Sequence, residues 1–149
     1  MSLKRSDFRF FHRLRVRWAE VDMQKIVFNG HYLTYIDTAI AEYWREIGLP
    51  YPQGYVERFG NDIYLRKATV EYLGSARYDD LLTVYCRVAS LGRTSMTFAF
   101  EIYRERDESA LVTAELVYVN ADPATMKAAP LPAELRDRVQ KYERVAPQA

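Results

Sequence analysis

The chain has 149 residues, and its 21 lysines and arginines are balanced by 20 aspartates and glutamates, which leaves a formal net charge of +1. With so little net charge, no overall field draws the protein to nucleic acid or to an anionic membrane. Cys86 is the only cysteine, so an internal disulfide framework and a cysteine-based metal cluster are both excluded.

The start of the chain gives no sign of a targeting segment. Residues 1–7 lack the apolar run of a signal peptide, and no later stretch reaches the length of a membrane span. We therefore expect a soluble, cytoplasmic protein without a metal, in which residues 1–149 form a single domain.

Alternation of apolar and charged residues predicts a first strand over residues 8–18. Arginines occupy one face of this strand, at positions 9, 13, 15 and 17. The apolar face consists of Phe8, Phe10, His12, Leu14, Val16 and Trp18. A histidine on such a face is more often a hydrogen-bonded core residue than a catalyst, so we interpret His12 as structural.

A loop joins this strand to the one strongly periodic helix of the chain. Apolar residues recur at three- and four-residue spacings from Gly30 to Ile47, with Asn29 as the predicted N-cap and Gly48 just beyond the end. The first backbone N–H groups of a helix have no partner within it and carry the positive end of its dipole, so they can polarise a carbonyl oxygen. The loop carries Asp22 shortly before these groups, and a carboxylate facing them suits acyl-transfer chemistry.

Four further strands are predicted after a loop rich in proline and glycine at residues 49–60. They cover residues 62–72, 82–88, 96–102 and 111–120, and the last three are expected to form an antiparallel meander. A short surface helix is predicted over residues 133–145, and the last three residues are expected to fray. The order β-α-β-β-β-β indicates an α+β fold, with one long helix on an antiparallel sheet of about five strands.

The most specific stretch of the sequence is Asp22 followed by Ile26-Val27-Phe28-Asn29 and Tyr32-Leu33. It resembles the hot-dog-fold acyl-CoA thioesterases of the 4-hydroxybenzoyl-CoA thioesterase type, whose loop reads Asp-x-x-Gly-hydrophobic-Val before the helix. The turn Tyr78-Asp79-Asp80-Leu81-Leu82 and residues 122–132 resemble later parts of the same family. A departure is Lys25, which stands where the family usually has glycine, a residue that tolerates backbone angles lysine disfavours.

This resemblance implies a hot-dog fold and the hydrolysis of an acyl-CoA thioester to free acid and coenzyme A, without a cofactor. It implies that Asp22 is the catalytic carboxylate, acting as general base on water or as nucleophile. Backbone N–H groups near Asn29 and Gly30 would polarise the thioester carbonyl. The resemblance and the sheet with a single long helix also lead us to expect a homodimer joined edge to edge, paired again into a homotetramer.

Three further residues are candidates for contact with the substrate. Glu20 could supply a second carboxylate, although on an extended segment it is expected to be a solvated charge. His31 lies in the first helical turn, where it could reach a ligand or face solvent. Arg93, in the Gly92-Arg93-Thr94 turn, is the first candidate for binding the phosphates of coenzyme A.

Other reaction classes lack the residues that they need. The sequence has no Gly-x-Ser-x-Gly elbow and no phosphate loop, and Cys86 lies in a strand pattern without a base partner. The related hot-dog hydratases pair an Asp with a His five residues later, and that position is Val27, so hydration is not expected. Two function classes stay open: a thioester hydrolase, and a non-catalytic hot-dog protein that binds acyl-CoA or serves assembly.

Overall fold

The computed structural model describes residues 4–149, so the first three residues of the N-terminal stretch lie outside it. Its sheet contains five strands: β1 (Phe10–Arg15), β2 (Asp62–Tyr72), β3 (Leu81–Leu91), β4 (Ser95–Arg104) and β5 (Val112–Ala121). The helices are α1 (His31–Glu46) and α2 (Ala133–Tyr142), with 3-10 turns at Arg5–Asp7 and Trp18–Glu20 and a π-helical turn at Gln53–Glu57. Among these residues, no helix has the length and apolar character that crossing a membrane requires.

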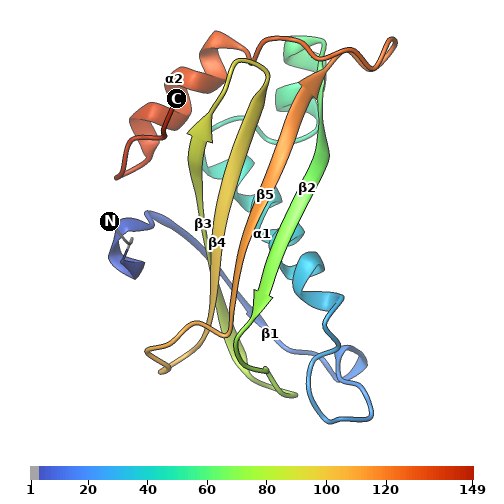
Figure 1. Cartoon of the computed structure of the whole chain (residues 1–149), viewed down its shortest axis with the longest axis vertical. Coiled ribbons are helices and arrows are strands. Elements are labelled where there is room, and N and C mark those ends of the chain that lie inside the picture. Colours follow the sequence, from blue (N-terminus) through green and yellow to red (C-terminus); the bar gives the residue numbers. More distant parts are fainter. Residues whose placement is uncertain (1–3) are drawn as a thin grey trace.

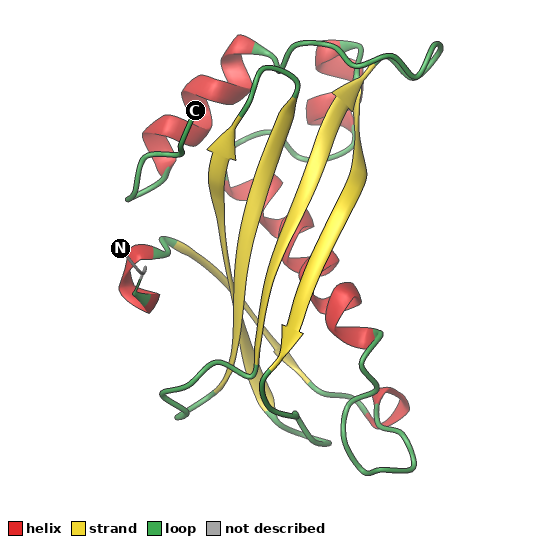
Figure 2. Cartoon of the chain, viewed as in Figure 1, coloured by secondary structure: helices red, strands yellow, loops and turns green. Residues whose placement is uncertain are grey.

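The strands form one antiparallel sheet in the order β1-β3-β4-β5-β2. The predicted meander is confirmed, because β3, β4 and β5 are neighbours in chain order. Figure 1 shows α1 lying across one face of the sheet, and Figure 2 shows the long strands in front of it. The predicted α+β architecture, one long helix on a five-stranded antiparallel sheet, is therefore confirmed.

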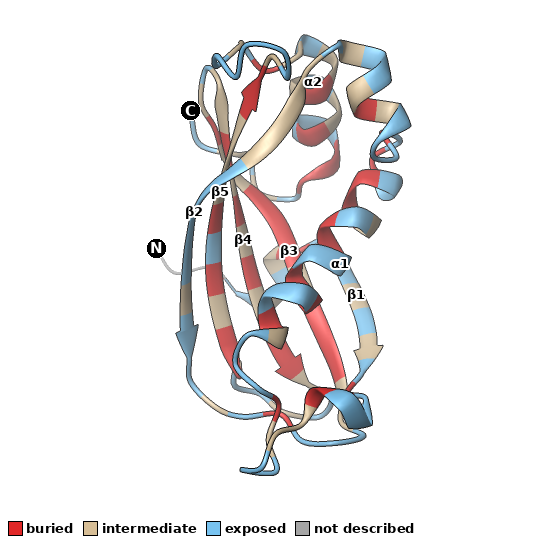
Figure 3. Cartoon of the chain, turned by 90° about the vertical axis from the view of Figure 1, so that its right-hand side faces the viewer, coloured by how far each residue is buried: buried red, intermediate tan, exposed pale blue. Residues whose placement is uncertain are grey.

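The core lies between α1 and the sheet. Figure 3 shows the buried residues of α1 turned toward the strands and the exposed ones turned away. The buried residues of α1 recur at the predicted helical spacing and are Tyr32, Tyr35, Ile36, Ala39, Ile40, Tyr43 and Trp44. They meet the inward residues of the central strands, such as Val84 of β3 and Phe98 of β4, which are fully buried.

The two ends of α1 follow from local chemistry. Gly30, not the predicted Asn29, is the N-cap, and the carbonyl of Asn29 accepts the N–H of Tyr32. A Cβ atom at Gly30 would lie 2.9 Å from the ring of Phe28, so glycine lets that ring approach the helix start. At the other end Gly48 has φ +84°, the left-handed conformation that glycine adopts most easily.

The first strand is shorter than its alternation predicts, and this corrects the expected position of Trp18. After β1 ends at Arg15, the N–H of Val16 bonds to the carbonyl of Asp80, and the chain then enters the Trp18–Glu20 turn. The turn breaks the two-residue period, so Trp18 leaves the apolar face and is 80% exposed.

The C-terminal segment packs against the sheet more closely than the sequence indicates. Leu135, Val139 and Tyr142 of α2 are buried, and Gln148 pairs with Ser90 instead of fraying. Between them, the Glu143 carboxylate accepts the N–H of Val88 at 3.0 Å, at a point of β3 that β1 no longer covers.

Candidate active site

The loop between the Trp18–Glu20 turn and α1 is folded back on itself by backbone hydrogen bonds. Val21 and Val27 form an isolated β-bridge, and the N–H of Asp22 bonds to the carbonyl of Ile26 at 3.0 Å. The N–H of Phe28 bonds to the carbonyl of Glu20 at 3.0 Å. These contacts hold Asp22 in a closed loop directly before the helix start.

The Asp22 carboxylate is partly exposed and only partly engaged by the protein. Its Oδ1 accepts the backbone N–H of Gln24 at 2.8 Å, a local turn that fixes the orientation of the side chain. Within residues 4–149, Asp22 has no cationic side chain within ion-pair distance. One face of the carboxylate is therefore available to a water molecule or a substrate.

Lys25 adopts the backbone conformation that the glycine of the resembled family would adopt easily. Its φ is +64°, and its N–H bonds to the carbonyl of Asp22 at 2.9 Å. Lys25 thus completes the loop in a backbone conformation that residues with a Cβ disfavour.

Two backbone donors at the start of α1 are not used by the protein. The N–H groups of His31 and Tyr32 bond to the carbonyls of Phe28 and Asn29. The N–H groups of Asn29 and Gly30, in contrast, donate to no acceptor in the described part of the chain. Gly30 is the N-cap and Asn29 lies one residue before it, so both N–H groups lie at the positive end of the helix dipole and can hold a developing negative charge.

Asp22 and the helix start line the same hollow. Its volume is about 290 Å³, and its walls are Asp22, Gln24, Ile26, Val27, Asn29, Tyr32, Tyr72, Gly74 and Ser75. The carboxylate and the residue with the unused N–H thus share one space that a thioester could enter. The sequence indicated both of these groups, but not the third wall, which comes from the end of β2 and the residues that follow it.

A second hollow, of about 710 Å³, also has Asp22 in its lining. Its lining is formed by Trp18, Val21, Asp22, Met23, Lys25, Arg77 and Tyr78. The rings of Trp18 and Tyr78 meet edge to face, 5.5 Å apart. Sequence reasoning missed this lining, and the only signal for it was the Tyr78-Asp79-Asp80 turn, to which no role had been given.

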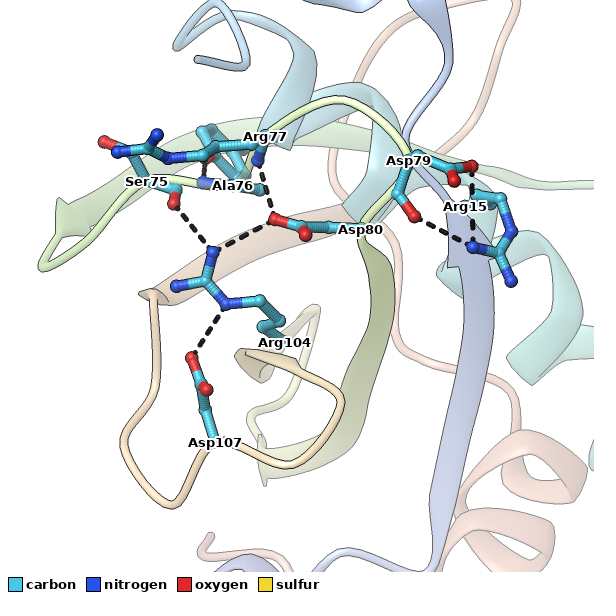
Figure 4. Close-up of polar contacts among 9 residues, drawn as sticks. Arg15, Ser75, Ala76, Arg77, Asp79, Asp80, Arg104 and Asp107 are labelled. Carbon is cyan, nitrogen blue, oxygen red and sulfur yellow. Dashed lines mark hydrogen bonds and ion pairs between the residues drawn. The ribbon is translucent and has the colours of Figure 1, made fainter. Parts of the chain in front are cut away.

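The turn that follows β2 connects the loop, the helix and the sheet. The carbonyl of Ala76 accepts the N–H of Val27 at 2.9 Å, and the N–H of Ala76 donates to the hydroxyl of Tyr32 at 2.9 Å. Figure 4 shows the Arg104 guanidinium bonded to Asp80 of the same turn and to Asp107 of the turn after β4, each at 3.0 Å. The walls of the site are therefore tied to the end of β4.

Glu20 is not the solvated charge that the sequence predicts, because the Trp18–Glu20 turn directs it inward and leaves it 5% exposed. Its carboxylate accepts the backbone N–H of Arg17 at 2.7 Å, the Arg17 guanidinium at 2.8 and 3.0 Å, and the hydroxyl of Tyr35 at 2.9 Å. Burial alone would raise the pKa of Glu20, but the bonds from Arg17 and Tyr35 outweigh burial and lower it.

The remaining predicted residues lie in different places. His31 is half-buried in the first turn of α1, edge to face with the ring of Phe28 at 5.8 Å. Arg93 lies in the turn between β3 and β4, at the end of the sheet opposite to the start of α1 (Figure 1). Within one chain, the structure therefore does not bring Arg93 to Asp22.

The fold is that of a hot-dog protein, in which a loop carboxylate and the residue before the N-cap of α1 line one hollow. Comparison with known proteins gives the family. The sequence pattern of the thioesterase superfamily matches residues 24–111. The chain therefore belongs to the thioesterase superfamily.

Two relatives and a solved structure agree with this assignment. The chain is 32% identical over 96 residues to a putative esterase of Aquifex aeolicus (strain VF5), covering 64% of this chain and 73% of the relative. It is 30% identical over 119 residues to the acyl-CoA thioester hydrolase YbgC of Escherichia coli O6:H1, and the match covers 80% of this chain and 87% of YbgC. The crystal structure of AQ1494 from Aquifex aeolicus superposes with a TM-score of 0.79 at 28% identity, over 87% of this chain and 98% of that one. The finer resemblance to the 4-hydroxybenzoyl-CoA type stays a prediction.

Proposed function

We propose that the protein hydrolyses acyl-CoA thioesters to a free acid and coenzyme A. The observation that carries this proposal is that the Asp22 carboxylate and Asn29, whose backbone N–H is unused, line one hollow. Membership of the thioesterase superfamily and the likeness to an acyl-CoA thioester hydrolase support it.

The proposed reaction uses two groups, the backbone N–H donors at the helix start and the Asp22 carboxylate. The thioester carbonyl oxygen accepts hydrogen bonds from the N–H groups of Asn29 and Gly30, which stabilise the charge that develops on it. Asp22 either removes a proton from the attacking water or attacks the carbonyl carbon itself, with water then hydrolysing the acyl-enzyme. The leaving thiolate is stable, because the pKa of a thiol is about 8.5, so no strong acid is required to protonate it.

A second copy of the chain is part of this proposal. The middle of β2, an edge strand, is exposed from Leu65 to Thr69, and Leu65 is 50% exposed although it pairs opposite Tyr118 of the core face. Leu65 and Ala68 place apolar surface on this edge beside Arg66 and Lys67, and the unpaired backbone groups of an edge strand invite pairing with another sheet. We propose a homodimer through β2, and a homotetramer built from two such dimers in the cytoplasm.

Pairing through β2 also gives a place to Arg93. If two β2 strands pair antiparallel, the Asp62 end of one lies beside the Tyr72 end of the other. The far end of one subunit, where Arg93 lies, is then turned toward the Asp22 end of its neighbour. We propose that Arg93 of the partner subunit binds coenzyme A phosphates.

Replacement of Arg93 by alanine should raise the KM for acyl-CoA several-fold at low salt, where phosphate contacts are strongest, and should leave kcat unchanged. An unchanged KM would refute this role.

The experiment for the main proposal is a panel of acyl-CoAs with short, long and aromatic acyl groups, in which released coenzyme A is measured with a thiol reagent. Because Cys86 is the only cysteine and is fully buried, the protein itself adds little signal. We expect release of free thiol in proportion to enzyme concentration for at least one acyl-CoA. Saturable binding of acyl-CoA without release of thiol would support the alternative, a non-catalytic binding protein of the same fold.

A further inference from the structure

Glu20 makes contacts that join three parts of the site. Its carbonyl accepts the N–H of Phe28, the residue directly before Asn29. Its carboxylate accepts the hydroxyl of Tyr35, which lies in α1 one turn after the helix start. Glu20 itself comes two residues before Asp22. Through its backbone carbonyl and its buried carboxylate, Glu20 thus links both ends of the Val21–Phe28 loop to the helix start.

We infer that Glu20 is a positioning residue, which fixes the Asp22 carboxylate relative to the N–H groups of Asn29 and Gly30. This inference rests on the proposed function, in which those groups act on one thioester. Glu20 does not line the hollow that Asp22 shares with the helix start, so it acts through the loop and through Tyr35 and does not touch substrate. Arg17 supports it, because the guanidinium binds Glu20 Oε2 through both Nε and Nη2 and holds the carboxylate in one orientation.

The expected effect of losing this contact is on the rate and not on substrate affinity. A shift of about 1 Å between reacting groups can cost up to about a hundredfold in rate. Glu20→Gln keeps the shape of the side chain and an acceptor for Tyr35, but its amide faces the Arg17 guanidinium with an N–H group. We expect kcat to fall about tenfold, with KM within about twofold of wild type.

A second variant tests the path through the helix. Tyr35→Phe removes only the hydroxyl and leaves Glu20 in place, so it should lower kcat less than Glu20→Gln. Because both changes loosen the same side chain, at Oε2 and at Oε1, their effects should be less than additive, and the double variant should be slower than Glu20→Gln by less than the loss seen in Tyr35→Phe alone. Matched controls are Tyr103→Phe, which removes a similar bond to Glu101 on β4, and Glu42→Gln, which removes an ion pair to Arg45 on the same helix. Both controls should keep wild-type kcat.

A readout without turnover separates this inference from the proposed function. In Glu20→Gln, hydrogen exchange should become faster at the Phe28 N–H, which bonds to Glu20, and at the Gln24 N–H, which bonds to Asp22. Unchanged exchange at both amides would overturn the inference even if the wild-type protein hydrolysed no acyl-CoA. Two kinetic results for Glu20→Gln would also overturn it: a wild-type kcat, or a raised KM at unchanged kcat. A third would be full activity of Tyr35→Phe together with a loss in Glu20→Gln as large as that expected for removal of the Asp22 charge.

Discussion

At the scale of single residues, the proposed chemistry depends on groups that the protein leaves unused. One oxygen of the Asp22 carboxylate accepts the backbone N–H of Gln24. The N–H groups of Asn29 and Gly30 have no acceptor in the described chain. Asn29 and Gly30 are exposed, so water can satisfy their N–H groups until a substrate replaces it. Asp22 and Asn29 line the same hollow, with Gly30 next in the chain, and this is the reason to place the reaction there.

Lys25 provides a residue-scale prediction about the loop. Its left-handed φ of +64° costs a residue with a Cβ roughly 1–2 kcal/mol, which glycine would avoid. Glycine is also more flexible in the unfolded chain, and this lowers the free energy of unfolding by about 0.5–1 kcal/mol. Lys25→Gly should therefore raise the free energy of unfolding by up to about 1 kcal/mol, measured by denaturant titration. Arg106→Gly is the matched control outside the site, because Arg106 has φ +79° in the turn after β4. A loss of stability in Lys25→Gly, beside a gain in Arg106→Gly, would contradict this description of the loop.

At the scale of elements, the sequence was informative where its periodicity was strong. The alternation in β3 and β4 and the helical spacing in α1 place their boundaries within a few residues of the observed ones. Periodicity was misleading at Trp18, because the alternation continues through a turn that is set by a long-range bond from Val16 to Asp80. No local pattern reports such a bond.

Part of the candidate site could be predicted for the same reason and part could not. Asp22 and the helix start are neighbours in the chain, so a local motif predicts them together. The burial of Glu20 depends on Tyr35, fifteen residues away on another element, and a lone glutamate carries no sign of that partner. The wall formed by Tyr72, Gly74 and Ser75 comes from the end of β2, and only the sheet order brings it to the loop.

Glu143 gives a prediction about how the C-terminal segment is attached to β3. It is buried, and its Oε2 accepts the hydroxyl of Tyr43 at 2.6 Å and the N–H of Val88 at 3.0 Å. Burial raises the pKa of Glu143 above its ordinary value of 4.5, although Tyr43, Val88, Arg87 and Arg9 oppose this shift. A carboxyl with a raised folded-state pKa contributes stability that is complete below pH 4.5 and is lost as the pH rises through the folded-state pKa.

Two variants at this position should therefore behave differently. Glu143→Gln does not ionise, so its stability relative to wild type should improve between about pH 4 and about pH 7. Glu143→Ala leaves the Tyr43 hydroxyl and the Val88 N–H buried without a partner, which should cost about 1–3 kcal/mol at either pH. Free energies of unfolding at the two pH values test both statements. If the difference between Glu143→Gln and wild type did not change with pH, the carboxyl would not have the raised pKa assigned to it.

At the scale of the whole molecule, the exposed edge of β2 predicts association. Two chains of 17.5 kDa should give a particle of 35 kDa in light scattering at micromolar concentration, and two dimers would give 70 kDa. Leu65→Lys should shift the protein toward monomer, because a charge on the inner side of an edge strand opposes pairing. Phe11→Lys is the matched control on β1, since Phe11 is 48% exposed and Leu65 is 50% exposed. A wild-type monomer, or dissociation by Phe11→Lys alone, would show that β2 is not the interface.

The most direct test of the central claim is the turnover of Asp22→Asn on the best acyl-CoA. This change keeps the shape of the side chain and the bond to Gln24, but it removes the negative charge that activates water or attacks the thioester. General-base catalysis is typically worth about 10²–10⁴-fold, so kcat should fall at least a hundredfold. KM should change far less, because the hollow and the N–H groups of Asn29 and Gly30 remain. Asp137→Asn on α2 serves as a control and should keep wild-type kcat. An Asp22→Asn protein with near-wild-type turnover would contradict the assignment of Asp22 as the catalytic carboxylate.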